Sequence, residues 1–289
     1  PVRSSCNRRD RHMATADDWY RRTKMKLISY VALNMAMVTP AFAQDTVMFD
    51  PDIVHEAKDG VVRLYGAGGP HTALQKVADL WQEQTGGTVA ITFGPEPKWS
   101  QQAQADADII WGTSEQSMTA FLETYKSFSS DQVMPIYLRP AIIAVKAGNP
   151  KSITGFDDLL AEGIKVVVTE GAGVGNTSGT GVWEDVAGRT GSLSDVVGLR
   201  KNIVAFEHGS GAGFKAFTDL DADAWITWPD WTSRNPEKIE AVAFSPDRAI
   251  WRDLNVALAP DADPEAQAFL NFLVTDEAQS LMKTEGWTR

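Results

Sequence analysis

Short apolar segments typical of β-strands recur along this chain, and amphipathic, helix-like segments separate them. The strand-like segments are residues 61–66, 88–94, 107–112, 136–148, 164–170, 203–209 and 222–228. Some alternate apolar and polar residues with a period of two, and others are continuously apolar, as buried strands are. Strands that alternate with helices predict an α/β fold in which parallel sheets are covered on both faces.

Two helices are predicted with particular clarity. The first has apolar residues at i, i+3, i+4 and i+7, namely Leu74, Val77, Ala78 and Trp81. The second begins at Asp263-Pro264, an N-cap residue followed by a proline at the first helical position. Its apolar stripe comprises Ala266, Phe269, Leu270 and Leu273. Both stripes are expected to face a hydrophobic core.

Almost every predicted strand ends in a cluster of glycines or small polar residues at the start of a helix. These clusters are GAGGPHT (66–72), GPEPKWS (94–100), GTSEQS (112–117), EGAGVGNTSGTG (170–181), EHGSGAG (207–213) and WPDW (228–231). In open α/β sheets, ligands bind beyond the carboxyl ends of the strands. Helix N-termini there offer free N–H groups and the positive end of the helix dipole. The pattern therefore predicts a binding site for an anion.

The loop 171–181 is the richest of these clusters in glycines and uncharged donors. Its glycines allow close approach of the backbone to a ligand, and Asn176, Thr177, Ser178 and Thr180 supply side-chain donors. No Lys-Ser/Thr pair follows its glycines, so an NTP-hydrolysing phosphate loop is disfavoured. The segment GAGGPHT likewise lacks the last glycine of a dinucleotide-binding fingerprint. A simple helix start with hydroxyl caps remains open as an alternative.

Residues 1–43 have the layout of an upstream segment and a secretory signal peptide. Lys24 and Lys26 precede the apolar run LISYVALNMAMV, and an A-x-A site at residues 41–43 follows it. The run falls short of the ~20 residues that a bilayer span needs. We therefore expect a start at Met25, cleavage before Gln44 and a periplasmic location.

Removal of this segment changes the composition. Residues 44–289 contain 19 basic and 35 acidic residues, a net charge of −16, compared with −11 for the whole chain. Such a charge opposes non-specific binding to nucleic acid or anionic lipid. The only cysteine, Cys6, is lost with the segment, so no disulfide is expected. The histidines show no metal-ligand spacing, and neither a metal site nor a cofactor is expected.

Several of these segments, in this order, resemble one known family. They are LYGAGGPHTAL, VAITFGPEPKW, DADIIWGTSEQS, EGAGVGNTSGTGVWEDVAGRT, NIVAF and ADAWITWPDW. Together they resemble the periplasmic binding proteins of the accessory colonization factor C family, a branch of the class that captures sulfate, molybdate and similar oxyanions. The resemblance spans residues 44–289 and implies a type II binding protein, with two doubly wound lobes joined by crossover hinge strands. One departure is that Val174-Gly175 stands where relatives can carry a lysine-serine pair, which puts ligand preference in doubt.

The resemblance implies a small anionic ligand, a phosphorylated or sulfated organic acid or a citrate-like carboxylate, held in the cleft without covalent chemistry. The expected ligand-binding residues are Gly68, Gly69, His71, Lys98, Trp99, Ser114, Arg139, Asn176, Thr177, Ser178, Gly179, Thr180 and Ser210. Arg139 lies within an apolar strand, where its guanidinium group suits bidentate capture of phosphate or carboxylate. An internal salt bridge to an acid such as Asp230 is the alternative role for it.

Two other functional classes are compatible with some of these residue types. A serine-histidine hydrolase could use Ser178 or Ser210 with His71 or His208, but no G-x-S-x-G elbow follows a strand. A surface adhesin with a secondary anion cleft is the alternative to a solute-binding protein that serves an inner-membrane ABC permease or a sensor. Partners among nucleic acids are not expected, and a homodimer is consistent with the resemblance. Lobe 1 is expected to comprise residues 44–138 and 245–289, and lobe 2 residues 139–244.

Overall fold

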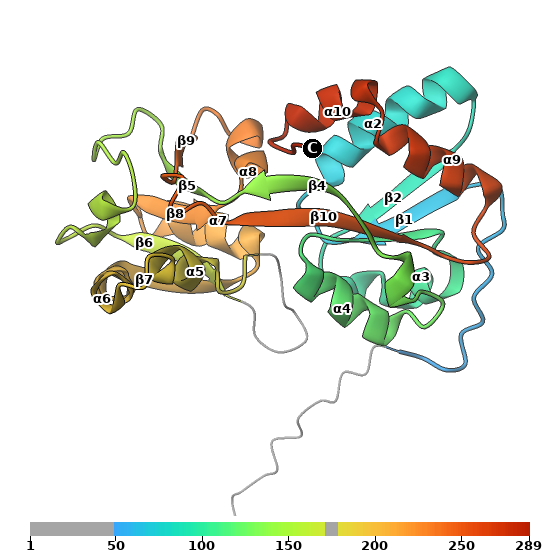
Figure 1. The fold of residues 1–289 in the computed structure, drawn as a ribbon, viewed down its shortest axis with the longest axis horizontal. Helices are drawn as coiled ribbons and strands as arrows, with labels where there is room; N and C mark the ends of the chain where they lie inside the picture. Colours follow the sequence, from blue (N-terminus) through green and yellow to red (C-terminus); the bar gives the residue numbers. More distant parts are fainter. Residues whose placement is uncertain (1–48, 171–178) are drawn as a thin grey trace, which may run out of the picture. The chain divides into compact units, whose positions relative to one another are not determined.

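The computed structural model describes residues 49–170 and 179–289, which form two mixed five-stranded sheets with helices packed on them (Figure 1). The predicted signal peptide and the loop residues Asn176, Thr177 and Ser178 lie outside the described residues.

The first lobe contains β1 (Val62–Gly66), α2 (His71–Thr85), β2 (Val89–Phe93), α3 (Ser100–Asp106), β3 (Ile109–Gly112), α4 (Glu115–Thr124), β4 (Met134–Pro140), β10 (Trp251–Leu258), α9 (Pro264–Leu273) and α10 (Asp276–Lys283). The second contains β5 (Ile142–Lys146), β6 (Val166–Glu170), α5 (Val182–Gly188), α6 (Leu193–Asn202), β7 (Ile203–His208), α7 (Ser210–Asp219), β8 (Ala224–Thr227), α8 (Pro229–Arg234) and β9 (Ile239–Ala243). Short 3₁₀ turns occur at η2 (Glu96–Lys98), η3 (Ser130–Gln132) and η4 (Asp157–Leu160).

The two sheets have equivalent strand orders, β2-β1-β3-β10-β4 and β7-β6-β8-β5-β9. In the first sheet β1 runs parallel to β2 and β3, and in the second sheet β6 runs parallel to β7 and β8. Strand β10 is antiparallel to β3 and β4, and β5 is antiparallel to β8 and β9. The sequence predicted parallel sheets, and the observed sheets are mixed.

The antiparallel strands are those that cross between the sheets. Strand β4 continues through Ala141 into β5, so the predicted run 136–148 is two strands in different sheets. Figure 1 shows β4 and β10 side by side across the middle of the molecule. A strand that arrives from the other lobe enters its sheet from the carboxyl ends of the parallel strands, so it runs opposite to them. The predicted lobe boundaries at residues 138/139 and 244/245 stay a prediction. Below, each strand is assigned to the lobe of the sheet that it joins, so Arg139 on β4 belongs to the first lobe.

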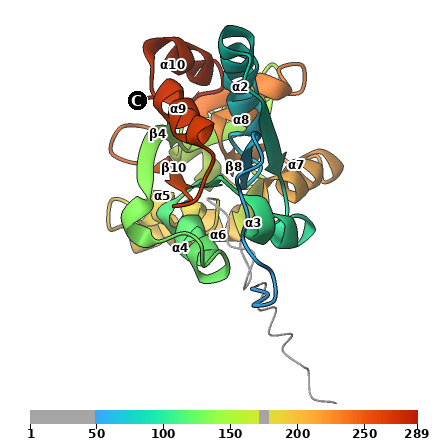
Figure 2. The same cartoon turned by 90° about the vertical axis from the view of Figure 1, so that its right-hand side faces the viewer.

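Helices cover both faces of each sheet, as an α/β fold requires. In the first lobe α2, α9 and α10 lie on one face and α3 and α4 on the other (Figures 1 and 2). The predicted stripe of α2 is buried, and the helix ends at Gly86 in the left-handed conformation. The stripe of α9 is buried as predicted. Apolar burial of these stripes provides most of the driving force for docking the helices.

Asp263 stands at the N-cap position of α9, as predicted, but its carboxylate does not cap the helix. It accepts instead from the backbone N–H groups of Asp59 and Gly60, at 3.2 and 2.9 Å. The segment before β1 is thus held to the start of α9. No helix within residues 49–170 and 179–289 combines the length and apolar character needed to cross a membrane.

Candidate functional site

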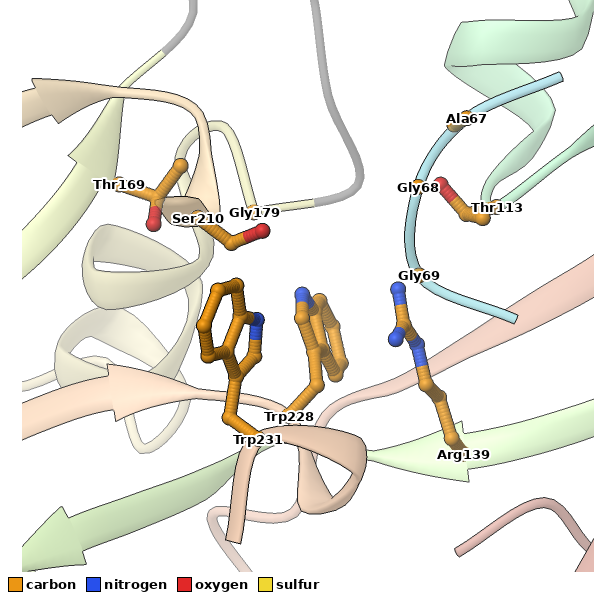
Figure 3. Close-up of a pocket in the computed structure, with 10 residues that line it drawn as sticks. All are labelled: Ala67, Gly68, Gly69, Thr113, Arg139, Thr169, Gly179, Ser210, Trp228 and Trp231. Carbon is orange, nitrogen blue, oxygen red and sulfur yellow. The ribbon is translucent and has the colours of Figure 1, made fainter. Parts of the chain in front are cut away.

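A pocket of about 60 Å³ is lined by residues of both sheets (Figure 3). Its size suits a small ion or headgroup better than a drug-sized ligand, for which pockets are roughly 300–1,000 Å³. The first lobe contributes Ala67, Gly68, Gly69, Thr113 and Arg139, and the second contributes Thr169, Gly179, Ser210, Trp228 and Trp231. The lining is polar on both sides, with main-chain, hydroxyl, indole and guanidinium groups.

The pocket lies where the parallel strands of both sheets end. The loop 67–69 follows β1, Thr113 follows β3, and Thr169 is near the end of β6. Trp228 follows β8, and Ser210 begins α7 directly after β7. Carboxyl ends of parallel strands are the usual ligand-binding edge of open α/β sheets. The position predicted from the glycine-rich clusters is therefore the position of the pocket.

Arg139 is the charged residue that lines the pocket. Its side chain is 1 % exposed, and its guanidinium carbon lies 4.4 Å from the ring centroid of Trp228 and 4.5 Å from that of Trp287. Cation–π contacts of this kind are favourable where the cation is desolvated. Burial lowers the pKa of Arg139 to about 10, and nearby Asp230 opposes that decrease. The guanidinium group therefore stays charged at neutral pH.

Asp230 of α8 neutralises Arg139 across the two lobes. Its Oδ1 accepts from Arg139 Nη1 at 2.8 Å, and its Oδ2 accepts from Arg234 Nη2 at 2.5 Å. Asp230 is 1 % exposed, so the ion pair is fully buried. Arg234 in turn lies over the ring of Trp231, with 4.7 Å from its guanidinium carbon to the ring centroid. Arg139 thus lines the pocket and forms the salt bridge with Asp230, and its contact with a ligand stays a prediction.

Two glycines of the lining are required by close contacts. A Cβ on Gly69 would lie 2.8 and 2.9 Å from the two terminal nitrogens of Arg139. A Cβ on Gly179 would lie 2.9 Å from the Cβ and Cγ2 of Thr169. Distances below 3.0 Å force a neighbour to move, so glycine allows the pocket walls to close on these groups.

Neutral donors complete the lining on the side of the second lobe. Figure 3 shows the Ser210 hydroxyl and the indole nitrogen of Trp228 directed toward the space between the lobes. Hydroxyl and indole N–H groups donate hydrogen bonds without adding charge. Together with Arg139 they can hold a desolvated anion by charge-assisted hydrogen bonds.

The predicted site residues fall into three groups. Gly68, Gly69, Arg139, Gly179 and Ser210 line the pocket. Asn176, Thr177 and Ser178 lie outside the described residues. The third group is not part of the lining: His71, Lys98, Trp99, Ser114 and Thr180.

Members of the third group have other contacts. Trp99 is buried in the core of the first lobe against Tyr125, and its Nε1 donates to Gly94 O at 3.2 Å. Ser114 caps α4, where its hydroxyl accepts from Ser117 N at 3.3 Å. Capping alone therefore accounts for Ser114.

His71 Nδ1 donates to Gly68 O. Lys98 ends the η2 turn and is exposed, and Thr180 lies in the turn before α5.

Five residues that line the pocket were not in the predicted set: Ala67, Thr113, Thr169, Trp228 and Trp231. Thr169 had a usable signal, because it is a polar residue at the end of the apolar strand VVVTE. Trp228 and Trp231 line the pocket, whereas Trp225 is buried on β8. The cluster WPDW, which follows the strand-like segment 222–228, contains Trp228 and Trp231 but not Trp225.

Comparison with known proteins agrees with this geometry. The sequence profile of a family described as bacterial extracellular solute-binding protein matches residues 62–288. The chain therefore belongs to this solute-binding family, and the predicted resemblance to periplasmic binding proteins is confirmed. No curated protein matches the chain.

Solved structures give more specific relatives. A structure of PEB3 with bound L-phospholactate is 44% identical, covers 79% of this chain and 99% of that chain, and has a TM-score of 0.76. Peb3 from Campylobacter jejuni has the same identity and coverage, with a TM-score of 0.74. The sulfate-binding protein SubI from Mycobacterium tuberculosis H37Rv is 19% identical, covers 79% of this chain and 86% of that chain, and has a TM-score of 0.62. At that identity SubI shows the shared two-lobed fold alone.

Proposed function

We propose that this chain is a periplasmic solute-binding protein that captures a small organic anion in the pocket between its lobes. The ligand carries a phosphate, sulfate or carboxylate group, and the complex is presented to an ABC-type importer or a sensor. Gly68, Gly69, Arg139 and Ser210 from the predicted set contact it, together with Thr113, Thr169 and Trp228. The observation that carries this proposal is the buried guanidinium group of Arg139 beside a lining of neutral donors.

The charges around the pocket support an anion as ligand. Arg139, Asp230 and Arg234 together carry a net charge of +1, because one carboxylate accepts from both arginines. Hydrogen bonds to charged groups contribute about 1.5–3 kcal/mol each. A few such bonds sustain micromolar affinity, about 8 kcal/mol, after the costs of association. A protein of net negative charge needs such local attraction, since its long-range field repels anions.

The relatives support both the ligand class and a role in binding rather than catalysis. L-phospholactate, the molecule bound to PEB3, combines a phosphate and a carboxylate on a short carbon chain. The matched family is described by solute binding outside the cytoplasm. Trp228 and Trp231 give the pocket apolar ring surface beside its donors, which suits an organic anion. We therefore propose reversible binding without covalent chemistry at Ser210.

A thermal-shift screen tests the proposal. The full chain is heated with L-phospholactate, citrate, inorganic phosphate, sulfate or molybdate, and with an uncharged sugar as control. A ligand at 100 times its dissociation constant stabilises a protein by about 2.7 kcal/mol, which raises the melting temperature by several degrees. Stabilisation by an organic phosphate or carboxylate, and none by the sugar, is the expected result. If none of the anions shifts the melting temperature, capture of a small anion is wrong.

A further inference from the structure

Two carbonyl groups of the loop between β1 and α2 accept hydrogen bonds from aromatic rings. Trp111 Nε1 donates to Ala67 O at 2.8 Å, and His71 Nδ1 donates to Gly68 O. Both donors are ring N–H groups from outside the loop. In a trans peptide the carbonyl oxygen of one residue and the N–H of the next point in opposite directions. The two bonds therefore fix the directions of the N–H groups of Gly68 and Gly69.

Trp111 is built firmly into the first sheet. It is fully buried on β3, and a Cβ on Gly66 would lie 2.4 Å from its ring. The absence of a side chain at Gly66 lets the indole pass beneath the strand end and reach the loop. Its bond to Ala67 O is thus a fixed part of the core.

His71 is held by ring stacking and by hydrogen bonds at both of its ring nitrogens. The imidazole stacks on Phe93, with 3.7 Å between ring centroids and 16° between the ring planes. A carbonyl oxygen only accepts, so Nδ1 carries the proton, and Nε2 accepts from the Thr72 hydroxyl at 3.3 Å. Burial lowers the pKa of His71 below its ordinary value and so favours the neutral ring, and the bond to Gly68 O selects the tautomer with the proton on Nδ1.

Gly69 of this loop lies against Arg139. The ideal Cβ position of Gly69 lies within 3 Å of both terminal guanidinium nitrogens. Pro70, the next residue, has no N–H group, so Gly68 and Gly69 are the last main-chain donors before α2. Successive N–H groups of this kind form an anion-binding concavity.

From these contacts we propose that His71 is a positioning residue. Together with Trp111 it binds both loop carbonyls, so that the N–H groups of Gly68 and Gly69 face the anion beside Arg139. This inference rests on the proposed function and replaces the predicted direct contact of His71 with ligand.

Two nearly isosteric substitutions test it in the full chain, with L-phospholactate as the titrated probe. In His71→Asn the side-chain amide replaces the Nδ1–H donor, whereas His71→Leu has no donor. We expect His71→Leu to bind about tenfold more weakly and His71→Asn to stay within about threefold of wild type. The amide proton resonance of Gly69 should shift on binding in the wild type and His71→Asn, and much less in His71→Leu. Gln75→Ala, an exposed change on the same helix, is the control and should bind like wild type.

Wild-type affinity in His71→Leu would overturn the inference, and so would equally weak binding by both variants. The ring nitrogens of His71 give a second readout in the ligand-free protein. Their ¹⁵N chemical shifts should show a protonated Nδ1, and a protonated Nε2 with bare Nδ1 would overturn the bond to Gly68. If the wild type does not bind L-phospholactate, an organic phosphate is not the ligand of the proposed function. The proposal that the loop N–H groups face this anion is then wrong as well. The ring signals then still decide whether His71 holds the loop.

Discussion

The two lobes share one strand order, and they also share an aspartate at the start of the third parallel strand. In the first lobe Asp108 accepts from Arg63 N at 2.7 Å, while its own N–H donates to Arg63 O at 3.1 Å. In the second lobe Asp223 accepts from Lys165 N at 3.0 Å, and its N–H donates to Lys165 O at 2.9 Å. In both sheets, the same pair of aspartate hydrogen bonds thus joins the beginnings of two adjacent parallel strands.

The lobes differ at the opposite end of the strands, where the pocket lies. The first lobe presents main chain and one guanidinium group, and the second presents hydroxyl and indole groups. The charge of the first lobe is balanced by Asp230, which belongs to the second. The two lobes therefore have the same arrangement of strands. The residues that follow each strand determine which chemical groups line the pocket from each lobe.

Arg139→Ala is expected to have the largest effect on this arrangement. It removes the charge of the first lobe and leaves Asp230 buried with Arg234 alone. Loss of one partner of a buried pair costs about 3–5 kcal/mol, which urea unfolding would measure. Calorimetric titration with L-phospholactate should show at least roughly 100-fold weaker binding.

Arg248→Ala is the matched control, because Arg248 is a buried arginine whose partners belong to the second lobe. Arg248 is also buried, and it pairs with Asp195 and donates to Val186 O at 3.2 Å. Its loss should lower stability but leave affinity unchanged, because Arg248 does not line the pocket. Wild-type affinity in Arg139→Ala would leave that residue with a structural role only.

The shared aspartate gives a prediction about pH. Burial raises the pKa of Asp108 to about 6, although two backbone N–H groups oppose this. Its ionisation therefore costs stability: the stabilising contribution is complete below the ordinary pKa near 4 and is lost as the pH rises through about 6. The destabilisation by Asp108→Asn should be larger at pH 4 than at pH 7.5, by about 2 kcal/mol, as measured by urea unfolding.

Asp158 of the second lobe should show the opposite sign. It accepts from the N–H and hydroxyl groups of Thr154, which hold its pKa below the ordinary value. Its contribution is present above that ordinary value and is lost as the pH falls. Asp158→Asn should therefore destabilise more at pH 7.5 than at low pH. Equal pH dependence in both variants would contradict this contrast.

Gly69→Ala tests the close contact between the loop and Arg139. The new Cβ would lie less than 3 Å from a guanidinium group that two tryptophan rings enclose, so the arginine has little room to move. Overpacking of this kind costs about 1–3 kcal/mol, and binding should weaken about tenfold. Gly68→Ala is the control for stability, because nothing lies within 4 Å of its Cβ position. Equal melting temperatures for the two variants would show that Arg139 adjusts without cost.

Ser210→Ala tests the second lobe and should have the smallest effect. One neutral hydroxyl contributes about 1 kcal/mol to binding, roughly a fivefold change in the dissociation constant by calorimetry. The unfolding free energy should hardly change, because Ser210 begins a helix beside solvent. Ser233→Ala, on the exposed face of α8, should leave both quantities unchanged. A loss as large as that of Arg139→Ala would reverse the proposed division between the lobes.

The sequence by itself determined the α/β class, most strands, the long helices and the edge at which the pocket lies. These features follow from local causes: apolar periodicity sets which face of α2 or α9 is buried, and glycines with small polar residues follow strands. Arg139 stood out because a charge in an apolar strand needs a partner, and Asp230 was among the acids named. Ser114 was placed correctly at a helix start, where it acts as a cap.

Only the tertiary structure decided which of these residues meet. The run 136–148 divides between two sheets because its neighbours in space, β10 and β8, lie about 80 or more residues away in sequence. Trp99 and Trp228 both lie in clusters that follow a strand, at residues 94–100 and 228–231, yet Trp99 fills a core and Trp228 lines the pocket. His71 bonds Gly68 because Phe93, from the neighbouring strand, fixes the plane of its ring. Periodicity tells which face of an element is buried, whereas the partner on that face depends on strand order, which long-range packing selects.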